Sequence, residues 1–133
     1  MSSSISASLF AQAKIVMKES VEKGLELLQQ AMEQAQQAND FKLEFDIILF
    51  LSRTYRVQEE TFPCLENLNK GFRILNRNFP QDHIRLSLIY KEYGSVYADC
   101  LNNNTIALDY SLKSLSLNNP NICLLYTSPS PRD

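Results

Sequence analysis

Tryptophan is absent from this chain of 133 residues, and histidine, glycine and cysteine are scarce, with one, three and three copies respectively. Cys64, Cys100 and Cys123 lack C-x-x-C spacing, so we expect no metal site and free thiols in a reducing cytoplasm. No glycine-rich phosphate loop and no G-x-S-x-G nucleophile elbow occurs. His83 lies beside Asp82 at an expected helix start, a place typical of a surface or capping residue. We therefore expect no enzymatic activity and no cofactor.

Neither sign of charge dominates, because the chain has 13 lysines and arginines and 15 aspartates and glutamates, which gives a net charge of −2. This balance disfavours nucleic-acid binding as the main function. The longest uninterrupted apolar run, residues 47–51, is far too short to span a bilayer. The first ten residues lack the basic start and apolar core of a secretory signal. We expect a cytoplasmic protein that binds neither membrane nor nucleic acid.

The chain does contain stretches with the periodicity of a helix, and these stretches occur in pairs. Residues 82–120 show it best, because Tyr90, Tyr93, Gly94 and Tyr97 fall on one face of a helix. Asparagines at 102–104 can cap a second helix, and Pro120 stands just beyond its end. Earlier helices are expected at 5–18, 21–38 and 41–57, and a fourth is expected after a cap at Thr61, lasting to about residue 78. Ser20 and Thr61 are the expected caps of the second and fourth of them.

One set of three small residues recurs along the chain. Its members are Ala13, Gly24 and Ala31, then Ser52, Cys64 and Gly71, then Gly94, Ala107 and Ser114. The last two are seven apart each time, and the gap before them lengthens from 11 to 12 to 13 residues. Large residues stand four before the first member and three after it: Leu9 and Val16, Ile48 and Tyr55, Tyr90 and Tyr97. A glycine inside a helix costs about 1 kcal/mol relative to alanine. We therefore expect helix backbones to approach closely at these positions.

Over residues 5–120 these patterns resemble the tetratricopeptide repeats, helix–turn–helix units that stack into a right-handed superhelix. The resemblance implies an all-α solenoid of three units, 5–40, 41–80 and 81–120, after a frayed start at 1–4. The first unit departs from the family, with Gln12 at a position usually large and apolar and Val16 replacing an aromatic residue. In the third, Ser111 replaces a large residue, and Tyr110 beside it is a candidate substitute.

The resemblance also implies a binding groove, because in the family the first helix of each unit lines a concave surface for peptides or partner helices. The implied groove positions are Phe10, Lys14, Met17 and Lys18, then Asp46, Leu49, Arg53 and Arg56, then Leu88, Lys91, Ser95 and Asp99. Five are basic and two acidic. We hypothesise a locally positive groove that prefers an acidic segment or a free carboxylate. A solvated face of mixed charge is the alternative.

The end of the chain differs from the rest. Residues 121–133 are expected to be unstructured, and CLLYTSPSPRD at 123–133 looks like a translated sequencing-library adapter, which would make the chain a truncated fragment. An ordinary disordered tail is the alternative. Natural repeat arrays end in a polar capping helix, and none follows the third unit. Leu108, Leu112 and Leu115 would then form an uncovered apolar edge, from which we expect marginal stability or self-association.

The function expected from these features is a non-catalytic protein–protein or peptide interaction module, the N-terminal repeat array of a larger bacterial regulatory or signalling protein. Two alternatives stay open. One is a fragment of a signalling enzyme of the diguanylate cyclase or histidine kinase type, whose catalytic domain is missing. The other is a small peptide-receptor adaptor. The sequence does not choose among them.

Overall fold

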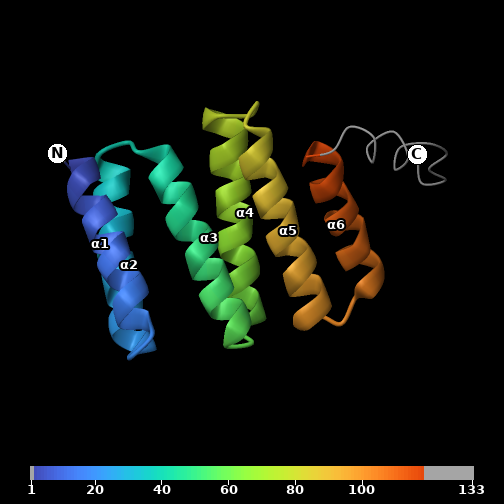
Figure 1. The fold of residues 1–133 in the computed structure, drawn as a ribbon, viewed down its shortest axis with the longest axis horizontal. Helices are drawn as coiled ribbons and strands as arrows, with labels where there is room; N and C mark the ends of the chain where they lie inside the picture. Colours follow the sequence, from blue (N-terminus) through green and yellow to red (C-terminus); the bar gives the residue numbers. More distant parts are fainter. Residues whose placement is uncertain (1, 119–133) are drawn as a thin grey trace. The chain divides into compact units, whose positions relative to one another are not determined.

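The computed structural model describes residues 2–118, and this part of the chain forms six helices and no strand. They are α1 (Ser2–Met17), α2 (Val21–Gln37), α3 (Phe41–Val57), α4 (Thr61–Asn78), α5 (His83–Asp99) and α6 (Asn104–Asn118) (Figure 1). The predicted all-α class is confirmed, α3 has the predicted bounds, and α4 ends at the predicted residue. Helix α1 begins three residues before the predicted position. Pro120, Cys123 and the tail at 121–133 lie outside the described residues.

Short polar side chains begin most of the helices. The Ser20 hydroxyl accepts a hydrogen bond from the backbone N–H three residues on, at 3.3 Å, which confirms the predicted cap of α2. The Asn103 side chain does the same for α6 at 3.1 Å, so the predicted asparagine cap is also confirmed. Two aspartates cap α3 and α5 in this way, Asp40 and Asp82.

The predicted cap at Thr61 is wrong. Glu60 occupies the N-cap position of α4, without a side-chain cap bond, and Thr61 is the first residue of the helix. The reason lies in the turn before it. Glu59 adopts a left-handed backbone with φ 61°, and the Glu60 N–H donates to the Tyr55 carbonyl at 2.9 Å, a bond that closes the end of α3. This tight backbone turn brings the chain into the next helix one residue early.

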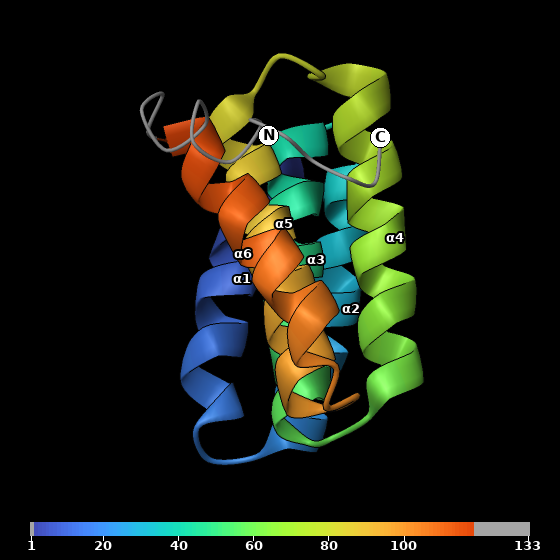
Figure 2. The same ribbon diagram turned by 90° about the vertical axis from the view of Figure 1, so that its right-hand side faces the viewer.

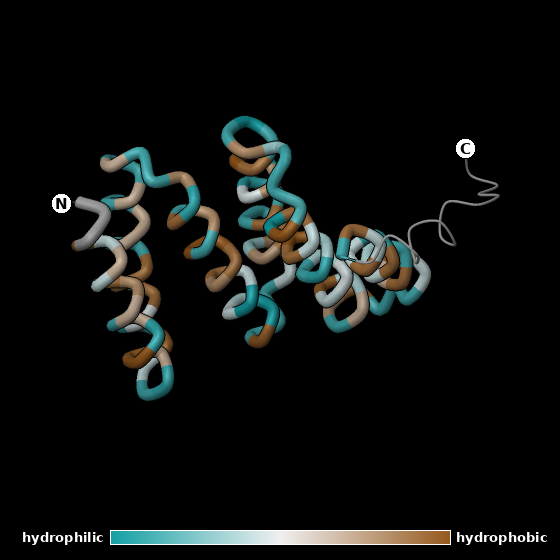
Figure 3. The backbone as a smooth tube through the Cα atoms, turned by 45° about the horizontal axis from the view of Figure 1, so that its top comes forward, coloured by the Kyte–Doolittle hydropathy of each residue, from teal (hydrophilic) through white to brown (hydrophobic). Residues whose placement is uncertain are grey.

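The chain forms two compact units, residues 1–51 and 52–133, and the boundary falls inside α3. The first unit holds α1, α2 and the larger part of α3. The second holds the end of α3 together with α4, α5 and α6. In both units the turns between helices are mostly hydrophilic, while apolar residues are spaced along the helices (Figure 3). Each unit therefore has apolar residues of its own with which to form an interior.

In the first unit, α1 and α2 are antiparallel and approach closely at both ends of the pair. The Ser6 hydroxyl donates to the Ala31 carbonyl at 2.7 Å. Near the connecting turn, a Cβ atom on Gly24 would lie 3.0 Å from the Cα of Met17, so only glycine fits without a shift. Phe10 and Phe50 pack edge to face, with ring centroids 5.7 Å apart. The unit thus closes on a small apolar core.

In the second unit, α5 packs against both α4 and α6 and runs antiparallel to each. Toward α4, the Tyr93 hydroxyl donates to the Asn69 side chain, and the rings of Phe72 and Tyr90 lie 6.2 Å apart. Toward α6, the Ser87 hydroxyl donates to the carbonyl of Ser114 at 3.2 Å. Figure 2 shows α6 lying across α5. Between α4 and α5 the order of the contacts is reversed, since the later Phe72 meets the earlier Tyr90 and the earlier Asn69 meets the later Tyr93.

Tyr110 of α6 packs against the tyrosines of α5. Its ring stacks on Tyr93, with centroids 5.1 Å apart, and on Tyr97, with centroids 5.8 Å apart. Ser111 is exposed, but its hydroxyl lies only 3.3 Å from where a Cβ atom on Gly94 would be. The absence of a side chain at Gly94 is therefore what lets α6 approach α5.

All nine small repeat positions are buried. They are Ala13, Gly24, Ala31, Ser52, Cys64, Gly71, Gly94, Ala107 and Ser114. At the neighbouring large positions, Tyr55, Tyr90 and Tyr97 are only partly exposed. Small buried residues let helix backbones come close, because a larger side chain at the crossing would hold them apart. The small positions therefore mark the interior of both units.

Candidate functional site

The implied groove positions divide between the two units. Lys14, Lys18, Asp46 and Leu49 belong to the first, and Arg53, Arg56, Lys91, Ser95 and Asp99 belong to the second. In the first unit both lysines are exposed, and the Lys14 ammonium lies 4.1 Å from the centroid of the Phe10 ring. Leu49 is buried. The second unit brings Arg56 and Asp99 into direct contact, so the candidate site lies there.

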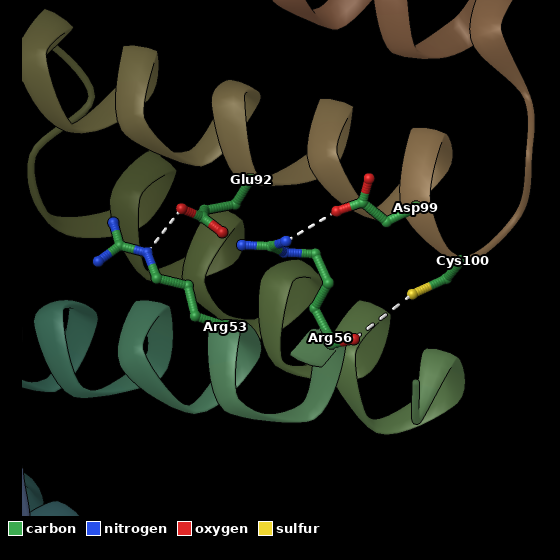
Figure 4. Close-up of polar contacts among 5 residues, drawn as sticks. All are labelled: Arg53, Arg56, Glu92, Asp99 and Cys100. Atoms are coloured by element: carbon green, nitrogen blue, oxygen red, sulfur yellow. Dashed lines mark hydrogen bonds and ion pairs between the residues drawn. The ribbon is translucent and has the colours of Figure 1, made fainter. Parts of the chain in front are cut away.

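Arg53, near the end of α3, is held by a carboxylate of α5. Its Nε donates to Oε2 of Glu92 at 2.7 Å, and the Glu92 side chain is only 7% exposed while that of Arg53 is 47% exposed. Figure 4 shows the two terminal nitrogens of Arg53 pointing away from Glu92. An arginine has five N–H donors in a rigid plane. One of them anchors the side chain here, and the terminal nitrogens remain for another acceptor.

Arg56 lies one helical turn further on and contacts a second carboxylate of α5. Its Nη1 donates to Oδ2 of Asp99 at 2.8 Å, with side chains 23% and 56% exposed. Its Nε is buried and has no hydrogen-bond partner among the described residues. The thiol of Cys100 points at the backbone carbonyl of Arg56, 3.9 Å away (Figure 4). Arg56 is therefore fixed in place with donors unused.

The two ion pairs give the relative direction of their helices. Arg53 precedes Arg56 in α3, and their partners Glu92 and Asp99 follow the same order in α5. The end of α3 and α5 therefore run parallel. Because both arginines contact α5 along the same edge of α3, their guanidinium groups lie side by side over it (Figure 4). The result is a short row of alternating charge across the two helices.

Glu92 is the member of this site that the sequence interpretation missed, because it is not among the positions that the family resemblance implies. The spacing of Glu92 from the implied groove positions of the same helix could have identified it. Glu92 stands four after Leu88 and seven before Asp99, which places all three on one helix face. With Glu92 counted, three cations of the second unit (Arg53, Arg56 and Lys91) face two carboxylates. This surface is therefore less positive than expected.

An aromatic cluster on the α5–α6 interface is structural. Burial raises the pKa of Tyr93 and of Tyr110 above the usual range of a phenol, with neighbouring tyrosines adding to the effect. Both phenols therefore stay protonated at neutral pH. The Lys113 ammonium lies 5.3 Å from the Tyr110 ring centroid and 3.4 Å from Oδ2 of Asp109. These two contacts lie within α6, and the stacking of Tyr110 on Tyr93 is what joins α6 to α5.

Two further reactive side chains, Cys64 and His83, lie within the described residues. Cys64 is 1% exposed, and burial, with Cys100 nearby, raises its pKa to about 11, so it remains a weakly reactive thiol. His83 is exposed at the first residue of α5. Within residues 2–118, no three histidine, cysteine or acidic side chains gather as metal ligands, and no helix is long and apolar enough to cross a bilayer.

Comparison with known proteins found no match for this chain. No protein-family model matches the chain, and neither a curated protein nor a solved structure matches it.

Proposed function

We propose that this chain is a non-catalytic protein- or peptide-interaction module, built from repeated helix pairs of the tetratricopeptide type. Its ligand is an acidic segment or a free carboxylate that binds across α3 and α5. The observation that carries the proposal is the pair of arginines, Arg53 and Arg56, which α5 holds side by side through one N–H each. Their remaining donors can take a carboxylate in the two-bond geometry that arginine favours.

A recurring hydrogen bond supports the repeat architecture. Ser6 stands seven residues before Ala13, and Ser87 stands seven before Gly94, so the two serines are equivalent in the repeat. Each donates to the carbonyl of the third small residue of its own set, at Ala31 and at Ser114. The parallel course of α3 and α5 is a second support, because first helices of stacked pairs run in the same direction.

Glu92 and Asp99 give the site its selectivity. They occupy one donor of each arginine and orient both guanidinium groups, so little side-chain entropy is lost when a ligand binds. They also repel an acidic ligand that approaches α5 itself. The favoured ligand therefore places its carboxylates over α3, beside Arg53, where the side chain is half exposed. Cys64 and Cys100 are free thiols, which supports a reducing, cytoplasmic setting as part of the proposal.

Fluorescence anisotropy with a short labelled peptide rich in aspartate and glutamate tests the proposal. We expect binding that weakens with salt, and no binding of a lysine-rich peptide of the same length. Arg53→Glu combined with Arg56→Glu should abolish binding. The matched control is Arg73→Glu with Arg77→Glu, two exposed arginines of α4, which should leave the affinity unchanged. Equal affinity of the first variant and the native chain would contradict the proposal.

A second variant separates loss of binding from loss of fold. Glu92→Gln keeps both arginines and removes one competing negative charge, while its amide oxygen can still accept the Arg53 Nε–H. We expect it to bind the acidic peptide several-fold more tightly than the native chain does. Unchanged or weaker binding by Glu92→Gln, in a variant whose circular dichroism spectrum is native, would show that the charge of Glu92 does not oppose the ligand.

A further inference from the structure

The two ion pairs between α3 and α5 differ in how firmly they are held. The Glu92 side chain is 7% exposed and binds the inner nitrogen of Arg53, Nε, so both terminal nitrogens of that arginine lie outside the pair. The Asp99 side chain is 56% exposed and binds a terminal nitrogen of Arg56, Nη1. A buried carboxylate that loses its cation is strongly unfavourable, whereas a pair that water reaches is weak. Asp99 is therefore the carboxylate of the two that another can replace.

Asp99 also stands at an unfavourable end of its helix. It is the last residue of α5, and the last turn of that helix contains no basic residue. The C-terminus of a helix carries a partial negative charge, which repels a carboxylate. The charge of Asp99 is thus opposed by its own helix and supported by Arg56 on α3. This contact relieves Asp99 without making the pair a strong one.

Arg56 is incompletely satisfied in the same contact. Its Nε is buried and has no hydrogen-bond partner among the residues that the structure describes. A buried donor without an acceptor is unfavourable. When the guanidinium group turns away from Asp99, this nitrogen can reach water or a ligand. The contact with Asp99 therefore leaves Arg56 with a donor that another acceptor can satisfy.

We propose that Asp99 is a built-in competitor, which an acidic ligand displaces from Arg56 while Glu92 stays bound to Arg53. The inference rests on the proposed function, because it describes how that same site is kept partly closed. In the free chain Asp99 orients Arg56 and occupies its Nη1 donor. A ligand carboxylate removes Asp99 before it binds both terminal nitrogens of this arginine. The Arg53–Glu92 pair keeps α3 and α5 together during the exchange, so the change is confined to two side chains.

Asp99→Asn tests the competition, with binding measured by fluorescence anisotropy of the labelled acidic peptide. The neutral amide competes less well for Arg56, and its pair is exposed, so the fold is retained. We expect the variant to bind roughly two- to fivefold more tightly than the native chain, the factor that corresponds to a solvent-exposed ion pair. The matched control is Glu66→Gln, an exposed position of α4 with the same change in net charge, which should leave the affinity unchanged. Unchanged or weaker binding by Asp99→Asn, or equal tightening in the control, would overturn the proposal.

The same substitution in an Arg56→Gln chain separates competition from general repulsion. Competition for Arg56 cannot occur in that chain, while the terminal nitrogens of Arg53 still bind the peptide. Asp99→Asn should then tighten binding much less than it does in the native chain. Equal tightening in both chains would show that Asp99 merely repels the ligand, and would overturn the proposal.

The outcomes also distinguish this inference from the proposed function. Binding that requires Arg53 and Arg56 but does not tighten in Asp99→Asn would overturn the competition alone. Absence of peptide binding in both the native chain and Asp99→Asn would overturn the proposed function, and the competition with it. Binding detected only in Asp99→Asn would support both, since the native site would then be fully closed by its own carboxylate.

Discussion

Ser6 and Ser87 make the same hydrogen bond in two different helix pairs. Each hydroxyl donates to a backbone carbonyl of the antiparallel helix, that of Ala31 at 2.7 Å and that of Ser114 at 3.2 Å. Both serines are buried, at 0% and 4% exposure. A buried hydroxyl without a partner is unfavourable, so each bond fixes the distance and the register of its helix pair.

Ser6→Ala should lower the free energy of unfolding by about 1 kcal/mol, because it removes a buried hydrogen bond without adding volume. Ser8→Ala is the control, since Ser8 is exposed on the same helix and should change stability by less than about 0.5 kcal/mol. Urea unfolding followed by circular dichroism measures both. Equal effects of the two substitutions would show that the Ser6 bond is not stabilising.

Gly24→Ala should destabilise the first unit by about 1–3 kcal/mol. Alanine is the better helix former by about 1 kcal/mol, but its Cβ would lie 3.0 Å from the Cα of Met17, and backbone must move to accommodate it. Gln30→Ala, at an exposed position of the same helix, controls for helix propensity. A more stable Gly24→Ala chain would show that α1 and α2 can separate freely.

Arg53→Gln should destabilise the second unit by about 1–3 kcal/mol, because the buried carboxylate of Glu92 loses its cation. Asp99→Asn should cost less than about 1 kcal/mol, since Asp99 is 56% exposed and water screens its pair with Arg56. Adding Glu92→Gln to Arg53→Gln should recover part of the loss. A double variant less stable than Arg53→Gln alone would show that the unpaired carboxylate is not the source of the loss.

Glu59→Gly should stabilise the turn between α3 and α4 by about 0.5–1 kcal/mol. Glu59 has φ 61°, a left-handed conformation in which a side chain with a Cβ is strained. Asn102→Gly, at φ 52°, should gain less because asparagine tolerates this conformation. Chemical denaturation of both variants gives the comparison. A loss of stability in Glu59→Gly would mean that its side chain makes a contact worth more than the strain.

The stability of the fold should fall at alkaline pH. Burial raises the pKa of Cys64 from 9.0 to about 11, so the unfolded chain releases this proton first, and stability declines as the pH rises above 9. The pKa of Tyr93, raised from 10.0, adds to the decline above pH 10. Cys64→Ala should flatten the profile between pH 9 and 11, and Tyr93→Phe should flatten it above 10. Denaturation midpoints measured across this range test both slopes, and an unchanged slope in Cys64→Ala would show that burial of this thiol is not responsible.

Helix positions followed from the sequence because they depend on local patterns. The bounds of α3 and the end of α4 matched, and Ser20 and Asn103 capped their helices as predicted, since a short polar side chain acts on its own backbone. Thr61 failed as a cap for a nonlocal reason. The backbone turn at Glu59 set the start of α4. Nothing in the sequence indicates that this glutamate adopts a left-handed backbone conformation.

The candidate site was predicted only in part. The family resemblance implied Arg53 and Arg56 as groove positions, and the structure shows them together over α5. Their pairing with Glu92 and Asp99 joins residues 39 and 43 positions apart, and that depends on how α3 lies against α5. Helix periodicity gives the face on which a charge lies. It does not give the charge that faces it from another helix.

The two ion pairs between α3 and α5 also have a mechanical consequence. They lie on one side of the second unit and join the end of α3 directly to α5. Helix α4, which lies between these two in the sequence, takes no part in either contact. Bending that opens this side must stretch both contacts, whereas bending toward it does not. Stiffness is therefore directional, and it depends on ionic strength, because salt screens the exposed pair of Arg56 and Asp99 more than the buried end of Glu92. We therefore expect the second unit to resist opening on this side more strongly at low salt than at high salt.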